Sequence, residues 1–149
     1  MTAAQHGFWL ETLEIGQAAE AIHVITEHDI QVFAALSGDS NPLHLDETFA
    51  ETTPFKGRVA HGMLSGAFIS AVLGTELPGP GAIYVSQSLE FKRPVRIGDA
   101  VVTRVEVTSI DQVKGRVTLS TVCRVNRKIA VDGEAVVLVA RRADSAEAA

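Results

Sequence analysis

The spacing of hydrophobic residues in the first third of the chain is that of a helix. Between Thr26 and Gly38, apolar residues recur at the interval that brings them to one helix face. Thr26 and Asp29 form a variant of the capping box that begins helices, and Gly38 is the usual residue to end one. The pattern predicts a helix from Thr26 to Gly38, preceded by an edge strand over residues 17–25. The apolar positions are Ile30, Phe33 and Ala34, with Ser37 in the same series.

A second stretch, from about His61 to Leu77, is apolar nearly all round and has few charged residues. Such a helix is buried on most sides, so we expect it at the centre of the fold. Gly62, Gly66 and Ser70 fall on one stripe of this helix, where small side chains let another backbone or a ligand approach closely. The Pro-Gly-rich residues 77–81 end it.

Beyond residue 81 the pattern changes to the alternation of strands. Short links between the strands predict antiparallel neighbours. Because one face of that sheet needs a cover, we expect an α+β fold in which a curved antiparallel sheet wraps around one long central helix. A single domain over residues 1–149 is expected, with a frayed tail at about 144–149. The predicted strands are 83–92, 101–108, 117–125 and 129–140, the last with a bulge at Asp132-Gly133.

Composition narrows the function classes. The 149 residues are 46% hydrophobic and 21% charged, with a net charge of −5, which is typical of a globular protein. No basic stripe suggests nucleic acid, and no apolar run approaches the ~20 residues of a membrane span. The single cysteine, Cys123, excludes an intrachain disulfide and indicates the cytoplasm. Met1–Leu10 lacks the basic region of a signal peptide.

Candidate chemistry is concentrated between Gly38 and Asp46. Pro42 has no N–H and disfavours a helical conformation at Asn41, so we expect an irregular, rigid loop. That loop would hold Asp39 close to His44, and an Asp–His pair supplies an acid and a base near neutral pH. From these residues alone, a helix-ending turn with a surface histidine remains an alternative. A metal site is another alternative, and its ligands would be Asp39, His44, Asp46 and His61.

Three motifs in this order resemble one family. They are Gly38-Asp39-x-Asn41-Pro42-Leu43-His44-x-Asp46, Ala60-His61-Gly62-Met63, and Phe91-Lys92-x-Pro94-Val95-x-x-Gly98-Asp99. Together they resemble the (R)-specific enoyl-CoA hydratases of the MaoC-like, hot-dog-fold superfamily. The resemblance covers residues 15–140, and its hot-dog fold agrees with the sheet and helix predicted above.

The resemblance implies that water adds to a trans-2-enoyl-CoA to give an (R)-3-hydroxyacyl-CoA, for storage polyester or fatty-acid metabolism. Asp39 and His44 match the acid–base pair, and Gly62 matches the residue whose backbone N–H binds the thioester oxygen. Ser70 matches a serine that helps to position the pair, while Asn41 would order the loop. The family also implies a homodimer with the site at its interface, and no metal or cofactor beyond the coenzyme A of the substrate.

Lys92 and Arg93 are candidates for binding coenzyme A, because with Arg96 they form the densest local group of basic residues; a solvated strand end is the alternative. A thioesterase of the same fold is a rival function. Many such thioesterases, and the related carrier-protein dehydratases, place a carboxylate on the central helix, whereas Arg58–Thr75 contains neither Asp nor Glu. A non-catalytic acyl-thioester-binding module is a further alternative, and the presence of both members of the Asp–His pair argues against it.

Overall fold

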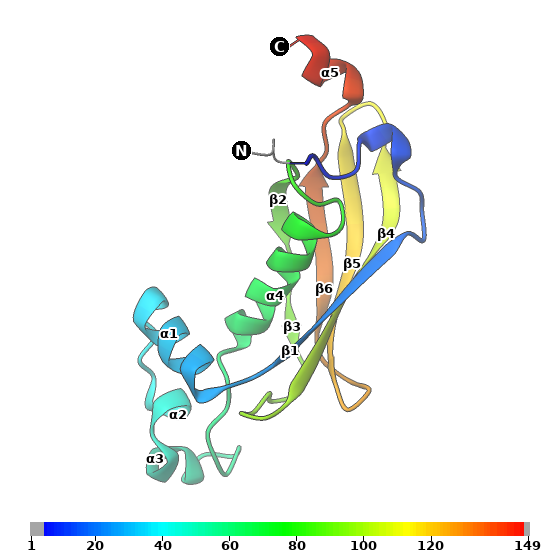
Figure 1. Cartoon of the computed structure of the whole chain (residues 1–149). Helices are drawn as coiled ribbons and strands as arrows, with labels where there is room; N and C mark the ends of the chain where they lie inside the picture. The colour runs from blue at the N-terminus through cyan, green and yellow to red at the C-terminus, as the bar shows by residue number, and fades with distance from the viewer. Residues whose placement is uncertain (1–4, 148–149) are drawn as a thin grey trace.

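The computed structural model describes residues 5–147 and is built on one antiparallel sheet (Figure 1). Its strand order is β1-β4-β5-β6-β2, and the short strand β3 also pairs with β6. The predicted edge strand is confirmed, because β1 forms one end of this order. The strands are β1 (Ala18–Val24), β2 (Ile83–Gln87), β3 (Glu90–Phe91), β4 (Ala100–Asp111), β5 (Arg116–Val125) and β6 (Lys128–Leu138).

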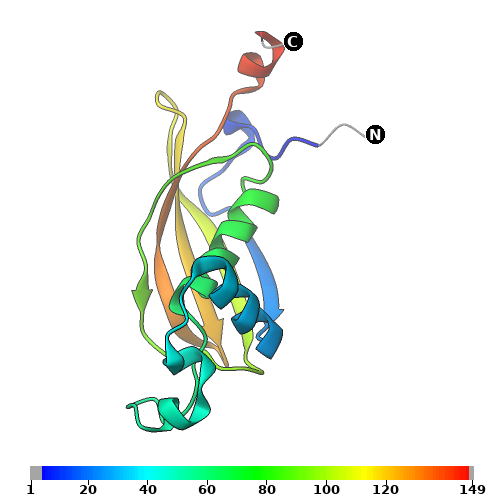
Figure 2. The same ribbon diagram turned by 90° about the vertical axis from the view of Figure 1, so that its left-hand side faces the viewer.

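One helix, α4 (Gly62–Thr75), lies along a face of the sheet (Figures 1 and 2). Its buried side chains include Ile69, Val72 and Leu73, and they meet an inner row of alternating strand residues such as Val105 and Leu119. Burial of this continuous apolar layer is the main source of stability. The arrangement confirms the hot-dog fold that the resemblance implied.

The expectation that the central helix is buried on most sides is wrong for the single chain. Its outer face, which includes Ala67, Ser70, Ala71 and Gly74, is exposed, and Met63 is 57% exposed. The helix is apolar all round, yet the sheet of one chain covers only one of its faces. An exposed, small-residue helix face therefore runs along the molecule.

The single strand predicted over 83–92 is divided into β2 and β3. The division follows from an irregular register against β6 between Tyr84 and Ser86, and from Ser88, whose N–H and hydroxyl bond the main chain of Glu134. A Cβ at Gly133 would collide with the Ser88 carbonyl oxygen, so the close approach of Ser88 to β6 requires a residue without a side chain at position 133. The register shift between β6 and β5 lies at Ala130 rather than at the expected Asp132-Gly133.

Three short helices lie at the N-terminal end of α4: α1 (Glu27–Ser37) beside it, and α2 (Pro42–Leu45) and α3 (Glu47–Glu51) beyond it (Figures 1 and 2). The capping box of α1 is confirmed, because the Thr26 hydroxyl accepts from the Asp29 N–H at 3.1 Å and the Asp29 carboxylate accepts from the Thr26 N–H at 2.8 Å. Gly38 ends α1 with φ +78°, a conformation that glycine adopts without strain.

The two ends of the described chain lie at the other end of the sheet (Figure 1). A 3₁₀ turn, η1 (Leu10–Thr12), buries Leu10, which is 0% exposed. Where we expected a frayed tail, helix α5 (Arg142–Glu147) occupies most of the segment, and residues 148–149 lie outside the described part. Among residues 5–147, no helix is long and apolar enough to cross a membrane.

Candidate active site

The predicted irregular loop is confirmed only over residues 38–41, because Pro42–Leu45 forms a helical turn, α2. Asn41 is its N-cap: the backbone is non-helical (φ −53°, ψ 124°), and the side-chain oxygen accepts from the Leu43 N–H at 3.0 Å. Pro42 occupies the first helical position, where a missing N–H costs no hydrogen bond. The same proline that excludes helix at Asn41 therefore favours one immediately after it, and that turn carries His44.

His44 is buried, with 8% of its surface exposed, so the alternative of a surface histidine is wrong. Its Nδ1 lies 2.7 Å from the Val59 carbonyl oxygen. A carbonyl can only accept, so Nδ1 carries the hydrogen and Nε2 is the bare nitrogen of the neutral ring. The main chain of the residue is held as well, because Arg58 donates from Nε to the His44 carbonyl at 2.7 Å.

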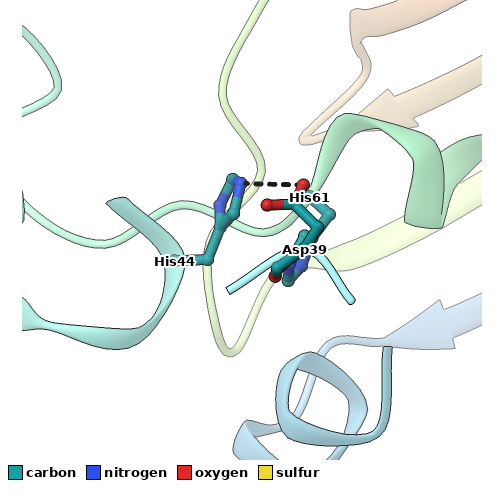
Figure 3. A group of neighbouring side chains, drawn as sticks. All are labelled: Asp39, His44 and His61. Atoms are coloured by element: carbon teal, nitrogen blue, oxygen red, sulfur yellow. Dashed lines mark hydrogen bonds and ion pairs between the residues drawn. The ribbon is translucent and has the colours of Figure 1, made fainter. Parts of the chain in front are cut away.

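Asp39 faces that bare nitrogen across a short gap (Figure 3). Its Oδ2 lies 4.0 Å from His44 Nε2, and the carboxylate is half exposed. The other carboxylate oxygen accepts from the Asn41 N–H at 3.2 Å, which fixes the side chain to its own turn. Two atoms 4.0 Å apart can both lie within ~2.8 Å of one oxygen atom, so a single water can contact both groups.

Gly62 is the first residue of α4, and its N–H has no backbone partner among residues 5–147. A helix N-terminus is an environment that stabilises negative charge, through its free N–H groups and the helix dipole. A Cβ at this position would lie 2.7 Å from Cε1 of Phe91. Glycine therefore allows the aromatic ring to pack directly against the start of the helix.

These groups line one cavity of about 420 Å³. Asp39, His44 and Gly62 are on its wall, and most of the remaining surface is apolar. A thioester with a hydrocarbon chain fits such a lining, because apolar walls bind the chain and a few polar groups orient the reacting atoms. The apolar lining includes Leu43, Phe55, Val59, Met63, Phe91, Val95 and Val131.

Lys92 and Arg93 also line this cavity, but they are not equivalent. The ammonium of Lys92 lies 2.9 Å from Glu90 and 3.8 Å from Asp132, and hydrogen bonding to Glu90 raises the pKa of Lys92. Arg93 donates to the Ile129 carbonyl at 2.9 Å and forms no ion pair with the side chains that the structure describes, residues 5–145. The charge of Arg93 is therefore the more available one for an anionic ligand.

Comparison with known proteins identifies the family. The family described as MaoC like domain matches residues 12–132. The chain belongs to the MaoC-like family. It is 55% identical, over 90% of its length and 93% of the relative, to an (R)-specific enoyl-CoA hydratase of Rhodospirillum rubrum. It is 45% identical to a 3-hydroxybutyryl-CoA dehydratase of Methylorubrum extorquens, over 92% of this chain and 87% of the other.

A solved structure gives the same result for the fold. The unliganded R-hydratase from Pseudomonas aeruginosa has a TM-score of 0.85 at 48% identity, and the match covers 91% of this chain and 88% of that one. Membership in the MaoC-like family confirms the resemblance inferred from the three sequence motifs. The roles of individual residues rest on the geometry above.

Ser70 does not lie with the Asp–His pair in this MaoC-like chain. It is exposed on the outer face of α4 and is absent from the residues lining the cavity. Eight residues separate it from Gly62, which is about 12 Å along a helix. A positioning role for Ser70 therefore remains a prediction, and within a single chain Ser70 lies too far from the pair to have that role.

His61 is a site residue to which the sequence assigns no part in the acid–base chemistry, only the approximate start of the central helix and a place in the alternative metal site. It is the N-cap of α4, but it is also 2% exposed and packed on the ring of His44. Its place directly before Gly62 was the available signal. A buried histidine at a helix start, within a series of functional motifs, is expected to contact other residues of the site.

The alternative of a metal site is partly supported by geometry. One ligand atom from each of Asp39, His44 and His61 lies within 4.8 Å of the others, whereas Asp46 instead caps α3 by accepting from the Phe49 N–H. One nitrogen of each histidine is already committed, that of His44 to the Val59 carbonyl and that of His61 to the Asp39 carbonyl. A function without metal stays a prediction, and full activity after dialysis against a chelator is its test.

Proposed function

We propose that this MaoC-like protein is an (R)-specific enoyl-CoA hydratase, which adds water to trans-2-enoyl-CoA and, in reverse, dehydrates (R)-3-hydroxyacyl-CoA. The observation that carries the proposal is the 4.0 Å approach of Asp39 to the bare nitrogen of His44, on the wall of the cavity that also contains Gly62. The names of the two relatives above describe the two directions of this one reaction.

The chemistry assigns a role to each group. Water must lose a proton as its oxygen bonds to C3, and a proton must be delivered to C2. Asp39 and His44 both reach one water position, so together they supply the base and the acid. Negative charge develops on the thioester oxygen as an enolate, and the free N–H of Gly62 at the helix N-terminus stabilises it.

The thioester carrier is proposed to be coenzyme A, with Arg93 near its anionic portion. Arg93 lines the cavity without a carboxylate partner among the described residues, whereas Lys92 is already paired with Glu90 and Asp132. The acyl chain then lies against the apolar walls. Arg93→Ala should therefore raise KM for the CoA thioester more than it lowers kcat.

We also propose a homodimer whose interface includes the exposed face of α4 and the edge strand β2. Strand β2 ends the sheet order, and Ile83 on it is 62% exposed. An uncovered apolar face and an unpaired edge are both removed from water when two copies associate. A second copy could also bring Ser70 of one α4 towards a site. Light scattering at micromolar concentration should give twice the 15.8 kDa of the chain.

Stereochemistry tests the proposed activity most directly. Purified protein is incubated with crotonyl-CoA, and loss of the enoyl absorbance is followed. Because carbonyl and water are held by different elements, only one face of C3 meets the water. Chiral chromatography of the hydrolysed product should give the (R) acid, and a coupled (S)-specific 3-hydroxyacyl-CoA dehydrogenase should stay silent. Reduction of NAD at the rate of hydration would overturn the assignment.

The thioesterase alternative is separated in the same experiment. Hydrolysis of the thioester releases a free thiol, whereas hydration leaves the thioester bond intact. In this chain α4 contains no acidic residue, so a water attacking the carbonyl has no carboxylate on that helix to activate it. We expect loss of the double bond without release of thiol, and a thiol signal that matches the loss of substrate would favour the thioesterase.

A further inference from the structure

His61 connects three parts of the site. It is the N-cap of α4, so its main chain leads directly into Gly62. Its ring packs on the ring of His44 with centroids 3.9 Å apart and an angle of 32° between planes. A second ring contact is with Phe33 of α1, with centroids 4.9 Å apart. The ring therefore contacts both the first helix and the histidine of the acid–base pair.

The connection to the third part of the site is a hydrogen bond to the main chain of Asp39. His61 Nε2 lies 3.0 Å from the Asp39 carbonyl oxygen. Because that oxygen can only accept, Nε2 carries the hydrogen and donates it. The side chain of His61 thus links Asp39, which supplies the carboxylate, to the start of α4, where the Gly62 N–H lies.

Packing alone does not explain a histidine at this position. His61 Nδ1 is buried and has no hydrogen-bond partner among residues 5–147. A buried acceptor without a donor is unfavourable, and a phenyl ring has a similar shape with no such atom. What a phenyl ring lacks is the N–H that reaches Asp39. Natural proteins keep a locally unfavourable group of this kind mainly at functional sites.

Resting on the function proposed above, we propose that His61 is a positioning residue. Its Nε2–H holds the Asp39 main chain so that the carboxylate faces His44 Nε2, at a set distance from the Gly62 N–H. It makes no contact with the reacting atoms in this role. Asp39 is half exposed, and among the described residues its carboxylate accepts a hydrogen bond only from the Asn41 N–H of its own turn, so a tether on its main chain is needed to orient it.

Two substitutions separate the donor from the ring. His61→Phe keeps the ring that packs on His44 and Phe33 but removes the N–H donor. His61→Gln loses the ring, yet its amide nitrogen can occupy the place of Nε2 and donate to Asp39. Misplacement of a reacting group by about 1 Å can cost up to about a hundredfold in rate. We therefore expect kcat for crotonyl-CoA to fall by at least about tenfold in His61→Phe, with KM little changed.

The melting temperature distinguishes positioning from a general structural role. His61→Phe also removes the unpaired Nδ1, so its Tm should equal or exceed that of the wild type while its kcat falls. His61→Gln should keep a higher kcat than His61→Phe despite the lost packing. His61→Leu serves as a second variant without a donor if His61→Phe does not fold. His28→Gln, at an exposed position of α1, is the matched control and should leave kcat unchanged.

The outcomes are distinct. Two results would overturn the inference and leave the proposed function standing. One is a fall in kcat of less than about fivefold in the folded variant without a donor. The other is a His61→Gln variant that is no more active than that variant. Wild-type protein that does not hydrate crotonyl-CoA overturns both. A fall of about fivefold or more, partly restored by glutamine at an undiminished Tm in His61→Phe, supports the positioning role.

Discussion

The sheet and the site segment, residues 38–62, are held together in different ways. Strands β4, β5 and β6 pair over most of their length through main-chain hydrogen bonds. In the site segment, single side-chain bonds end on single carbonyl oxygens: His44 on that of Val59, Arg58 on that of His44, and His61 on that of Asp39. Stability is therefore distributed over the sheet, whereas the geometry of the site depends on a few individual bonds.

Burial differs in the same way. The inner strand side chains are almost completely removed from water, and Val105 and Leu119 are each 0% exposed. In the site, Asp39 is half exposed beside the buried His44. A change in the sheet should then reduce the free energy of unfolding while leaving the rate of the folded enzyme intact. A change in the site should do the reverse. Three sets of variants test this contrast, and a fourth measures the ion pair that joins α1 to the site segment.

The largest effect on stability is expected from Leu119→Ala in the middle of β5. Removing this fully buried side chain leaves a cavity, which typically reduces the free energy of unfolding by about 2–5 kcal/mol. Chemical denaturation measures the loss, and kcat of the folded fraction should be unchanged because Leu119 does not line the site cavity. Val113→Ala, in an exposed turn, is the control and should change little. An equal loss of unfolding free energy in both variants would contradict the expectation that stability depends on the buried side chains of the sheet.

Replacement of the acid–base pair should have the opposite signature. Asp39→Asn and His44→Ala should each lower kcat for short trans-2-enoyl-CoA by at least about a hundredfold, the usual scale when a proton-transfer group is lost. Circular dichroism must show that each variant is folded, and His28→Ala provides a control. If a folded variant kept more than about a tenth of the wild-type kcat, the assignment of the pair would be wrong.

Gly62→Ala should reduce the rate by about tenfold through misplacement of an N–H that is still present. The new Cβ would lie 2.7 Å from the ring of Phe91, so either the ring or the start of α4 must move. Gly74→Ala on the same helix is the control, since a Cβ there has nothing within 4 Å in the single chain. Because Gly74 lies on the face of α4 proposed for the dimer interface, light scattering must show that the variant keeps the oligomeric state of the wild type. In that state it should keep kcat and gain about 0.4–1 kcal/mol of stability. Equal kcat in the two variants would argue against an oxyanion role for Gly62.

The smallest effect concerns the ion pair behind His44. Arg58 donates to both carboxylate oxygens of Glu27, at 2.8 and 2.9 Å, and these hydrogen bonds lower the pKa of Glu27 from its ordinary 4.5. A carboxylate whose pKa is lowered in the folded state stabilises the protein at pH values above its ordinary pKa. This stabilisation is lost as the pH falls through the lowered pKa. Glu27→Gln should cost about 1 kcal/mol or less at pH 7, because the carboxylate is 47% exposed.

The pH dependence sharpens that test. The difference in unfolding free energy between wild type and Glu27→Gln should shrink as pH falls below 4.5, because the wild-type carboxylate is then protonated. Glu51→Gln, at an exposed position without an ion pair among the described residues, should show no such pH-dependent difference. A constant difference from pH 7 to pH 3 would mean that the Arg58–Glu27 charge pair is not its source.

Local pattern was enough for most of the elements. The capping box at Thr26, the C-cap at Gly38 and the alternating strands are local features, and the structure confirms them. It was not enough for α2, because Asn41-Pro42 obeys two rules at once: proline excludes helix before it and favours helix after it. The prediction of an irregular loop used only the first of these two rules. The motifs also identified the family, since their residue types and spacing are read directly from the chain.

Which distant groups meet depends on tertiary packing and cannot be read from local pattern. His44 bonds the carbonyl of Val59 fifteen residues away, and His61 bonds that of Asp39 twenty-two residues away. Periodicity reports which face of an element is buried, but not which carbonyl of another segment a side chain will reach. That choice depends on how α1, α2 and α4 pack at one end of the sheet. The motifs and the periodicity therefore predict the fold and the candidate pair, whereas packing between distant segments brings His61, and not Ser70, into contact with that pair within one chain.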